Sequence, residues 1–381
     1  MNQKSPQKFL WGAATSSHQV EGGTTNDWSE WEKVNAERLS KESGGAYPPE
    51  NYISGIAADH YNRYEEDFDI ARDLGHNAHR FSIEWSRVEP SPGRFDREAI
   101  KHYQKVIAAL RERGIEPMVT IYHWTMPLWF RDMGGWLCPE APEYFERFAW
   151  AMAHAFPDVK YWVTINEPLI YVGFSYVLGA WPPQTKNIFK TIRVLKQLVE
   201  AHKRAYKTLH RLIPGCRVGI VNNNKYFSKR RFHILRYLRN EWILEQVQDC
   251  NDFIGLNYYH GDRETGAKND MNWSIDPEGF YKVLMELKRF GKPIYITENG
   301  LADHNDSRRA DFIKTHIWAM ERAMKDGVDV RGYLHWSLLD NFEWDKGYWP
   351  EFGLVHVDRK TLKRTVRPSA LVYKKIIEGR E

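Results

Sequence analysis

"KYWVTINEP" at residues 160–168 and "KPIYITENG" at residues 292–300 decide how this chain folds. Each is a short run rich in β-branched and aromatic residues, and each ends in polar residues, which is typical of a buried strand. Six further runs have this character: "KFLWGAATS" from 8, "NAHRFSIEW" from 77, "EPMVTIYHW" from 116, "CRVGIVNNN" from 216, "DFIGLNYYH" from 252 and "VRGYLHWSLLD" from 330. The sequence therefore predicts eight strands.

Amphipathic helices are predicted between these strands. Apolar residues recur there at steps of three or four, and glycines mark several helix ends, as in "DLGHNAHRF" and "RFGKPIYIT". The clearest series are Ala57, Tyr61, Tyr64, Phe68, Ala71 and Leu74, and Ile100, Tyr103, Ile107 and Leu110. Strands that alternate with such helices form parallel sheets. An open doubly wound sheet is the alternative, but no glycine-rich phosphate loop occurs. We predict an α/β fold in which residues 1–381 form a single (β/α)₈ TIM-barrel domain.

Composition limits the function classes. Aromatic residues make up 14% of the 381 residues, which suits either a large core or stacking on sugar faces. A net charge of +4 is too small for a nucleic-acid protein, and the basic segment 225–240 is predicted to be a solvated helix face. No stretch reaches the length of a signal peptide's apolar region or a membrane span, and the three cysteines form no metal or disulfide pattern. We expect a cytoplasmic protein with no nucleic-acid or membrane partner.

Polar side chains gather at the carboxyl ends of the predicted strands, where the active sites of such barrels lie. Glu167 ends the fourth strand and Glu298 ends the seventh. "NEP" could be only a strand stop and "ENG" only a turn. Closing the barrel, however, would bring both carboxylates to one pocket. The other residues at these ends are Gln19, Arg80, Glu84, His123, Asn166, Asn223, Asn257, Tyr259, Asn299 and Trp336.

Two carboxylates at one pocket are typical of glycoside cleavage. One protonates the departing oxygen, and the other attacks C1 or activates water. At about 5 Å and an effective dielectric constant near 20, two negative charges repel by roughly 3 kcal/mol, equivalent to about two pKa units. One glutamate should therefore keep its proton near neutral pH while the other ionises.

The chain resembles family 1 glycoside hydrolases, the β-glucosidase and β-galactosidase family, over nearly its whole length. The motifs that carry the resemblance are, in order, "FLWGAATSSHQVEG", "HRFSIEWSRVEP", "VTIYHWTMP", "VTINEP", "DFIGLNYY", "ITENG" and "HWSLLDNFEW". The resemblance implies retaining hydrolysis of terminal β-glycosides, small or oligomeric, through a covalent glycosyl-enzyme intermediate. It makes Glu167 the acid/base and Glu298 the nucleophile. It implies no metal or organic cofactor, because the carboxylate pair suffices.

The resemblance also implies roles around the sugar. Gln19 and His123 resemble ligands of the 3-hydroxyl region, and Asn166 resembles the ligand of the 2-hydroxyl. Arg80 and Tyr259 resemble residues that support the nucleophile, the first by its charge and the second by a hydrogen bond.

Three further residues resemble the groups that contact the sugar ring and its outer hydroxyls. Trp336 resembles the residue on which the sugar ring stacks. Glu343 and Trp344 resemble the residues that contact the 4- and 6-hydroxyls. A carboxylate at Glu343 would repel a phosphate on the sugar, and Glu351 is expected to disfavour phosphate as well, so we predict an unphosphorylated sugar. The predicted substrate-binding set is completed by Trp124, Asn257 and Phe352.

The chain departs from the family in length, with segments missing after the fifth and sixth strands. We expect fewer walls around the leaving group and tolerance of varied or longer leaving groups. β-Glucosidase activity is expected first, with β-galactosidase or β-fucosidase side activity. The alternatives are a non-catalytic sugar-binding relative and a transglycosylase that uses the same intermediate. The exact sugar and a homo-oligomeric state are left open by the sequence.

Overall fold

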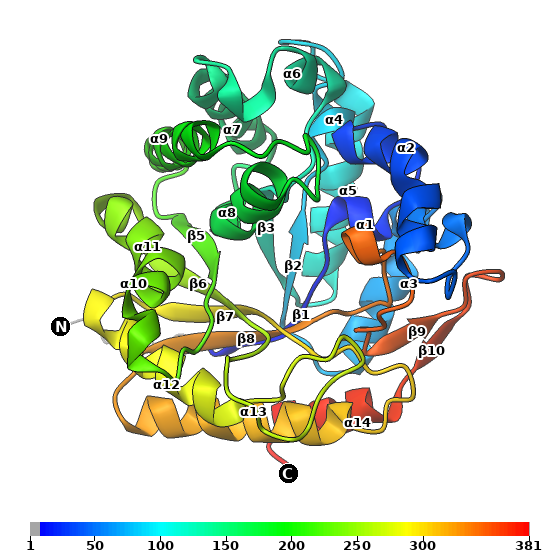
Figure 1. Ribbon diagram of the computed structural model, residues 1–381, viewed down its shortest axis with the longest axis vertical. Helices are drawn as coiled ribbons and strands as arrows, with labels where there is room; N and C mark the ends of the chain where they lie inside the picture. Colours follow the sequence, from blue (N-terminus) through cyan, green and yellow to red (C-terminus); the bar gives the residue numbers. More distant parts are fainter. Residues whose placement is uncertain (1–7, 381) are drawn as a thin grey trace.

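A computed structural model describes residues 8–380 of the chain, and within them eight parallel strands close into one barrel (Figure 1). The strands follow one another in chain order, and the first pairs with the eighth. Their bounds are β1 (Leu10–Ala14), β2 (Ala78–Ser82), β3 (Glu116–Tyr122), β4 (Tyr161–Asn166), β5 (Arg217–Asn223), β6 (Phe253–Tyr258), β7 (Ile294–Asn299) and β8 (Val330–Trp336). Each lies inside one of the eight predicted runs, so the predicted (β/α)₈ barrel is confirmed. That residues 1–381 form one domain stays our proposal.

Helices surround the barrel, and α13 and α14 lie side by side along one edge (Figure 1). The longer ones are α2 (Asp27–Glu42), α3 (His60–Asp73), α5 (Arg97–Glu112), α7 (Ala141–Ala155), α9 (Ile188–Leu212), α12 (Pro277–Leu287), α13 (Arg309–Lys325) and α14 (Pro368–Ile377). None of the helices within residues 8–380 is long and apolar enough to cross a membrane.

Short helices occupy the connections that follow the strands. They are α1 (Ser17–Val20), α4 (Trp85–Val88), α6 (Leu128–Asp132), α8 (Pro168–Val172), α10 (His233–Arg236), α11 (Trp242–Gln246), η1 (Pro49–Tyr52), η2 (Gly135–Leu137), η3 (Gly173–Leu178), η4 (Arg230–Phe232), η5 (Tyr237–Glu241), η6 (Gln248–Cys250), η7 (Lys288–Phe290) and η8 (Trp344–Lys346). After β8 a two-stranded antiparallel sheet follows, made of β9 (Val355–Val357) and β10 (Arg364–Val366).

The apolar core has two layers. The larger layer packs the outer surface of the barrel against the helices. A smaller cluster is formed by Leu10, Ala78, Met118, Tyr161, Val163, Val221, Phe253, Tyr295 and Leu334, which come from all eight strands. Filling of a barrel by strand side chains makes it a packed core and not a pore. The opposite, carboxyl ends of the strands are left for polar side chains.

Local sequence explains where the helices begin and end. In α5 the Asp96 side chain accepts hydrogen bonds from the amides of Glu98 (2.8 Å) and Ala99 (3.0 Å), which caps the free N–H groups. The helix is followed by Gly114 with φ +69°, a conformation that glycine adopts at little cost. The predicted apolar series from Ala57 is shorter than expected, because α3 begins only at His60. Ala57 has φ +48° and lies in the turn before the helix.

Three strands become irregular where they approach the carboxyl end of the barrel. The pairing register shifts between Val163 and Asn166, between Leu256 and Asn257, and between Ile296 and Asn299. Bulges of this kind redirect side chains and are common beside active sites. The predicted position of Gln19 at a strand end needs correction, since β1 ends at Ala14 and Gln19 lies in α1.

Candidate active site

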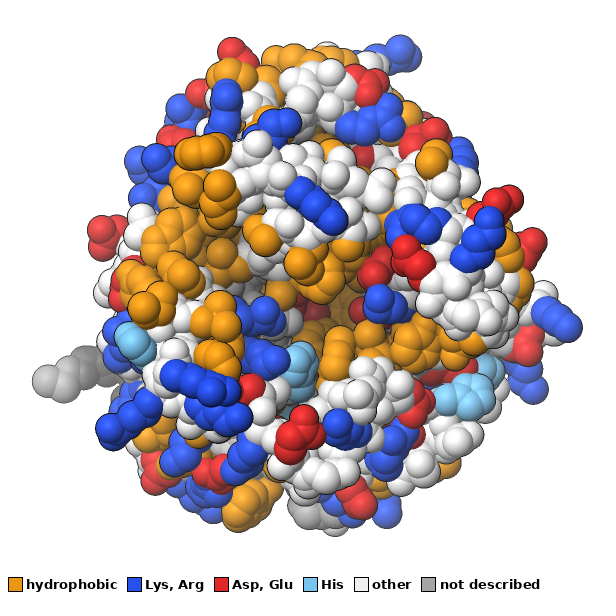
Figure 2. Space-filling view, viewed as in Figure 1, with side chains coloured by type: hydrophobic (Ala, Val, Ile, Leu, Met, Phe, Trp, Pro, Cys, Tyr) orange, Lys and Arg blue, Asp and Glu red, His pale blue; other side chains and the backbone are white. Residues whose placement is uncertain are grey.

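A cavity of about 270 Å³ opens at the carboxyl ends of the strands. The space-filling view shows the hollow, with acidic and apolar side chains inside it and basic side chains at its rim (Figure 2). Ten of the residues predicted from the sequence line it, namely Gln19, His123, Trp124, Glu167, Asn223, Tyr259, Glu298, Trp336, Glu343 and Trp344. Arg80, Asn166 and Asn257 do not line it, but they contact the two glutamates or each other directly below.

The backbone is unusual at three positions of this cavity. Trp124 (φ +75°), Glu167 (φ +45°) and Trp344 (φ +52°) adopt left-handed conformations that non-glycine residues seldom use. Each such residue costs on the order of 1–3 kcal/mol, and such residues cluster at functional sites. At Glu167 this conformation immediately precedes Pro168, the first residue of α8. The chain thus turns sharply at the glutamate itself.

Glu298, in β7, is held by two donors, one on each carboxylate oxygen. Arg80 from β2 donates to Oε1 at 2.5 Å, and the Tyr259 hydroxyl donates to Oε2 at 2.6 Å. Arg80 is 1% exposed, and its charge therefore acts with little screening by water. Both contacts favour the ionised carboxylate.

Glu167 has a different environment, although it is equally buried. Its Oε1 accepts hydrogen bonds from the side-chain amides of Asn257 (2.6 Å) and Asn223 (3.0 Å), which are neutral groups. No hydrogen bond from residues 8–380 reaches Oε2. This oxygen is therefore available to carry a proton toward a bound molecule.

The two carboxyl groups influence each other. Burial, and next the negative charge of Glu298, raise the pKa of Glu167 to about 7. Burial also raises the pKa of Glu298, but the Arg80 guanidinium and the Tyr259 hydroxyl oppose that rise. Glu298 therefore loses its proton first, and Glu167 keeps its own near neutral pH. Charge repulsion alone was expected to separate the two pKa values, whereas burial is the larger cause for Glu167.

Asn166 connects the nucleophile side of the cavity with its sugar-facing side. Its Oδ1 accepts from the second arm of Arg80 (2.6 Å), and its Nδ2 is 3.1 Å from His123 Nε2. The His123 ring lies nearly parallel to those of Trp336 and Trp344. Burial lowers the pKa of His123 well below its usual range, so the ring is neutral. Its buried Nδ1 has no hydrogen-bond partner within the described residues.

Gln19 and Glu343 form the far end of the cavity. The Gln19 amide donates to Asn341 Oδ1 (3.0 Å), to the carbonyl of Phe342 (2.8 Å) and to Glu343 Oε2 (3.3 Å). Burial, followed by the charge of Glu298, raises the pKa of Glu343 to about 8. Together these groups present carboxyl and amide atoms, which suit sugar hydroxyls.

Two residues named from the sequence, Glu84 and Phe352, do not line the cavity. Glu84 does not line the cavity, since it is fully buried and accepts from Ser17, Ser86 and Thr125. Phe352 lies behind the cavity lining and packs its ring against Tyr259 at 6.1 Å. Direct contact between Phe352 and a sugar stays a prediction.

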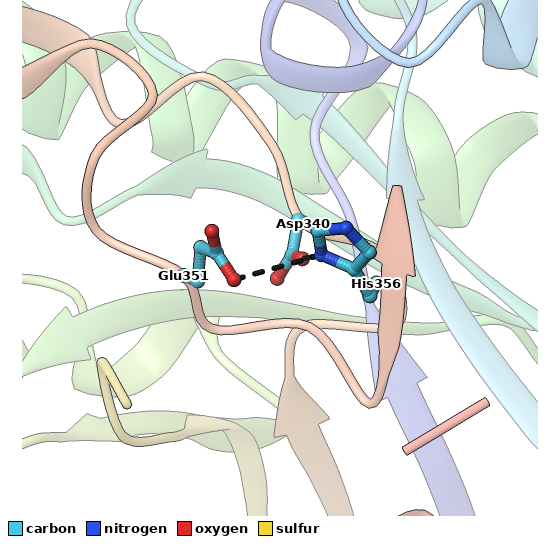
Figure 3. A group of neighbouring side chains, drawn as sticks. All are labelled: Asp340, Glu351 and His356. Carbon is cyan, nitrogen blue, oxygen red and sulfur yellow. Dashed lines mark hydrogen bonds and ion pairs between the residues drawn. The ribbon is translucent and has the colours of Figure 1, made fainter. Parts of the chain in front are cut away.

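Glu351 also lies outside the cavity lining, in a charged group with Asp340 and His356 that Figure 3 shows. The three ligand atoms are close enough to hold a metal ion. Arg367, however, already donates to both oxygens of Asp340 (3.0 and 2.9 Å) and to Glu351. A buried guanidinium in this position neutralises the carboxylates, so the group does not fit a cation. Because its charge is paired with Arg367, Glu351 is not positioned to act on a sugar phosphate by its charge, and its effect on phosphorylated sugars stays a prediction.

Several cavity residues were not singled out from the sequence. Lys225 and Arg239 line the cavity, whereas segment 225–240 was predicted to be a solvated helix face. That prediction holds for Lys229, Arg230 and Arg231, which are exposed. A π-type turn in η5 places Arg239 toward the barrel instead, and no helical spacing rule could have identified it. The other unpredicted lining residues are Ile170, Phe174, Trp181, His260, Met271, Trp273, Asp345 and Lys346.

Known proteins are similar to this chain in both sequence and fold. The family model for glycosyl hydrolase family 1 matches residues 1–233 and 261–381. Beta-glucosidase A of Thermotoga maritima is 34% identical over 99% of this chain and 98% of its own length. That alignment spans 445 positions, so this chain of 381 residues lacks segments that the relative has.

Solved structures give the same result. A beta-glycosidase from Pyrococcus horikoshii superposes with a TM-score of 0.89 and is 36% identical, covering 100% of this chain and 96% of its own. Beta-glucosidase from Thermotoga maritima in complex with glucoimidazole also has a TM-score of 0.89, at 33% identity and 99% coverage of both chains. Sequence, fold and cavity agree, and the chain belongs to glycosyl hydrolase family 1.

Proposed function

We propose that this chain hydrolyses terminal, unphosphorylated β-D-glucosides with retention of configuration, with Glu298 as nucleophile and Glu167 as acid and base. The observation that carries the proposal is the unequal environment of the two glutamates. Glu298 accepts hydrogen bonds from a guanidinium and a hydroxyl. Glu167 accepts them from two neutral amides at Oε1, and its Oε2 is left open. This arrangement supplies an ionised nucleophile and a protonated acid in one cavity.

In the first step the Glu298 carboxylate attacks C1 of the sugar, and an electron pair of Oε1 or Oε2 forms the new C–O bond. The bond between C1 and the glycosidic oxygen breaks as Glu167 gives its proton to that oxygen. The leaving group departs as a neutral alcohol, and Glu167 becomes a carboxylate. The Tyr259 and Arg80 contacts keep the Glu298 side chain in position for the attack.

In the second step Glu167 acts as a base. The loss of the negative charge on Glu298 removes one cause of the raised pKa of Glu167, so its carboxylate is stable at neutral pH. It takes a proton from a water molecule, whose oxygen attacks C1 and releases Glu298 as a carboxylate. The sugar leaves as the β-anomer, and both glutamates return to their starting protonation states.

The glucose preference is supported by the far end of the cavity and by the names of the relatives. Gln19, Glu343 and His123 offer donors and acceptors to the outer hydroxyls, and Trp336 and Trp344 supply flat apolar faces. Within the described residues, that end of the cavity offers no unpaired cation to a sugar phosphate. The only cation at that end within the described residues, Lys346, is already paired with Asp345 at 2.8 Å.

Rates on para-nitrophenyl β-glycosides that differ only in the sugar test the proposal. We expect the highest kcat/KM on the glucoside and no measurable turnover of any of them by Glu298→Ala. A sugar other than glucose preferred by more than tenfold would refute the glucose assignment. Undiminished turnover by Glu298→Ala would refute the nucleophile assignment.

A further inference from the structure

The cavity continues beyond Glu167 toward the leaving group, and its wall there comes from the segments after β5 and β6. Glu167 delivers its proton to the glycosidic oxygen, so the residues beyond it face the group that departs. Arg239 is linked to it, since its Nη2 donates to Asn223 Oδ1 (2.9 Å) and Asn223 Nδ2 donates to Glu167 (3.0 Å). Lys225 and His260 line the same wall. We call Lys225 and Arg239 the leaving-group cations.

The leaving-group cations are not directly paired within residues 8–380, although the carboxyl group of Glu167 lies near Arg239 and that of Asp262 near Lys225. Neither forms an ion pair with any carboxylate in residues 8–380, and the buried Nε of Arg239 has no hydrogen-bond partner. Burial lowers the pKa of both side chains. Arg236 on the same segment behaves differently, because it pairs with Glu241 (3.0 Å) and Glu286 (3.2 Å). Partly buried charges without partners are costly, so this wall is suited to bind an anion.

Apolar side chains complete this part of the cavity. Ile170 from α8 and Phe174 from η3 follow Glu167 directly along the chain, and Met271 and Trp273 come from the connection after β6. The Trp273 ring stacks on His260, with centroids 5.1 Å apart. A flat apolar group can therefore lie here while a charged substituent reaches the leaving-group cations.

We propose that the natural leaving group carries an anionic substituent, a carboxylate or a phosphate, on an apolar and preferably aromatic body. The inference rests on the proposed function and names the class of its substrate. Lys225 and Arg239 bind the anion, and the apolar side chains bind the ring. Arg239 and His260 lie between the two ranges that the family model matches, 1–233 and 261–381.

The charge of Glu167 changes in a way that fits this substrate. Before cleavage its carboxyl group is protonated and does not repel an anion. After it has given its proton to the leaving group it is a carboxylate, and it then repels the anionic alcohol while competing for Arg239. Binding before the first step and release before water enters are both favoured.

Three matched substrates test the proposal: para-(carboxymethyl)phenyl, para-(phosphonomethyl)phenyl and para-(carbamoylmethyl)phenyl β-D-glucoside. In each substrate a methylene group separates the substituent from the ring and weakens its electronic effect, so the three leaving phenols have similar pKa values. We expect kcat/KM for at least one anionic substrate to exceed that for the neutral amide by about tenfold at low salt. The excess should shrink in high salt, because the cations are only partly buried.

Substitutions identify the residues that cause the preference for an anionic leaving group. Lys225→Met and Arg239→Met should each lower the ratio of anionic to neutral kcat/KM severalfold, and the double variant should bring it to about one. Lys229→Met is the matched control, since it removes one exposed charge from the same segment and should leave the ratio unchanged. Because each ratio is internal to one variant, a general loss of activity does not obscure it.

Failure of this inference can be distinguished from failure of the proposed function. Equal hydrolysis of all three glucosides, or an anion preference that survives in the double variant, would overturn this inference and leave the proposed function intact. Absence of hydrolysis of all three, and of para-nitrophenyl β-D-glucoside, would overturn the proposed function and this inference with it.

Discussion

At the scale of single residues, the partners of two glutamates separate their chemistry. Glu167 and Glu298 are each 3% exposed, so burial alone cannot distinguish them. Arg80 and Tyr259 donate to Glu298, whereas only amides donate to Glu167. The sequence predicted both glutamates from their places at strand ends. The open Oε2 of Glu167 could not be predicted, because it depends on where two asparagine side chains point.

The acid role of Glu167 predicts a dependence on the leaving group. Glu167→Ala should slow cellobiose hydrolysis by roughly 10²–10⁴-fold, because the departing alkoxide needs a proton. The loss in the first step should be far smaller for a dinitrophenyl glucoside, whose leaving group is stable as an anion. Presteady-state release of the phenol measures that step directly. Equal losses on both substrates would contradict the acid assignment.

The pKa of Glu167 predicts the alkaline side of the pH profile. Its proton is required for the first step and is lost as the pH rises through about 7. We therefore expect kcat/KM on cellobiose to fall above pH 7. A dinitrophenyl glucoside, whose leaving group needs no proton, should show a much smaller alkaline decline with the unaltered protein. An equal decline on both substrates would show that another group causes it.

At the scale of elements, the connections after β5 and β6 distinguish this chain. Residues 224–252 form the short helices α10 and α11 with η4, η5 and η6, and residues 259–293 include α12. The sequence showed that these connections are short, but it did not show which of their residues line the cavity. Fewer walls were expected, yet η5 contributes Arg239 to the cavity. Helical periodicity predicted a solvated face for residues 225–240, because a π-type turn does not follow that periodicity.

The shortened connections predict tolerance of long leaving groups. Because these segments follow strands on the face where the substrate enters, their loss leaves the cavity open beyond the first sugar units. We expect kcat/KM to vary by less than about threefold from cellobiose to cellotetraose, on the order of 0.6 kcal/mol. Product release measured by chromatography checks this. A steep preference for cellobiose would contradict it.

At the scale of the whole molecule, closure of the barrel brings the site together. The eight strands could be predicted because each is a short apolar run followed by polar residues, and parallel strands of a barrel place those residues at one end. Pairing of β1 with β8 then brings Glu167 and Glu298 around one cavity. Contacts between distant loops could not be predicted. Phe352 packs behind the cavity, and Glu351 is paired with Arg367, because the loop after β8 folds back against β9.

Burial of carboxyl groups around the cavity should reduce the stability of the whole fold at alkaline pH. The pKa of Glu343 is raised to about 8 from 4.5. Between these values the unfolded chain has lost the proton that the folded chain keeps, so the free energy of unfolding falls as the pH rises. Glu343→Gln should raise the free energy of unfolding at pH 8.5 by about 2 kcal/mol, less than the full shift implies because the side chain is partly exposed.

The same variant should change little at pH 4, where the carboxyl group is protonated in both states. Denaturant unfolding at the two pH values measures the difference. Gln19→Ala, which removes a neutral neighbour of the same carboxyl group, is a control that should not stabilise the protein at pH 8.5. Equal effects of Glu343→Gln at both pH values would contradict the linkage to this proton.

The central claim is that Glu298 bonds to the sugar while Glu167 holds the proton, and one measurement tests it directly. The protein is incubated with dinitrophenyl β-D-glucoside that carries fluorine on C2. The fluorine slows both steps, and the dinitrophenyl leaving group keeps the first fast enough for the intermediate to accumulate. It is then digested and its peptides are sequenced by mass spectrometry. We expect one fluoroglucosyl group per chain, attached to Glu298 in "ITENG". A label on Glu167, or turnover without any label, would contradict it.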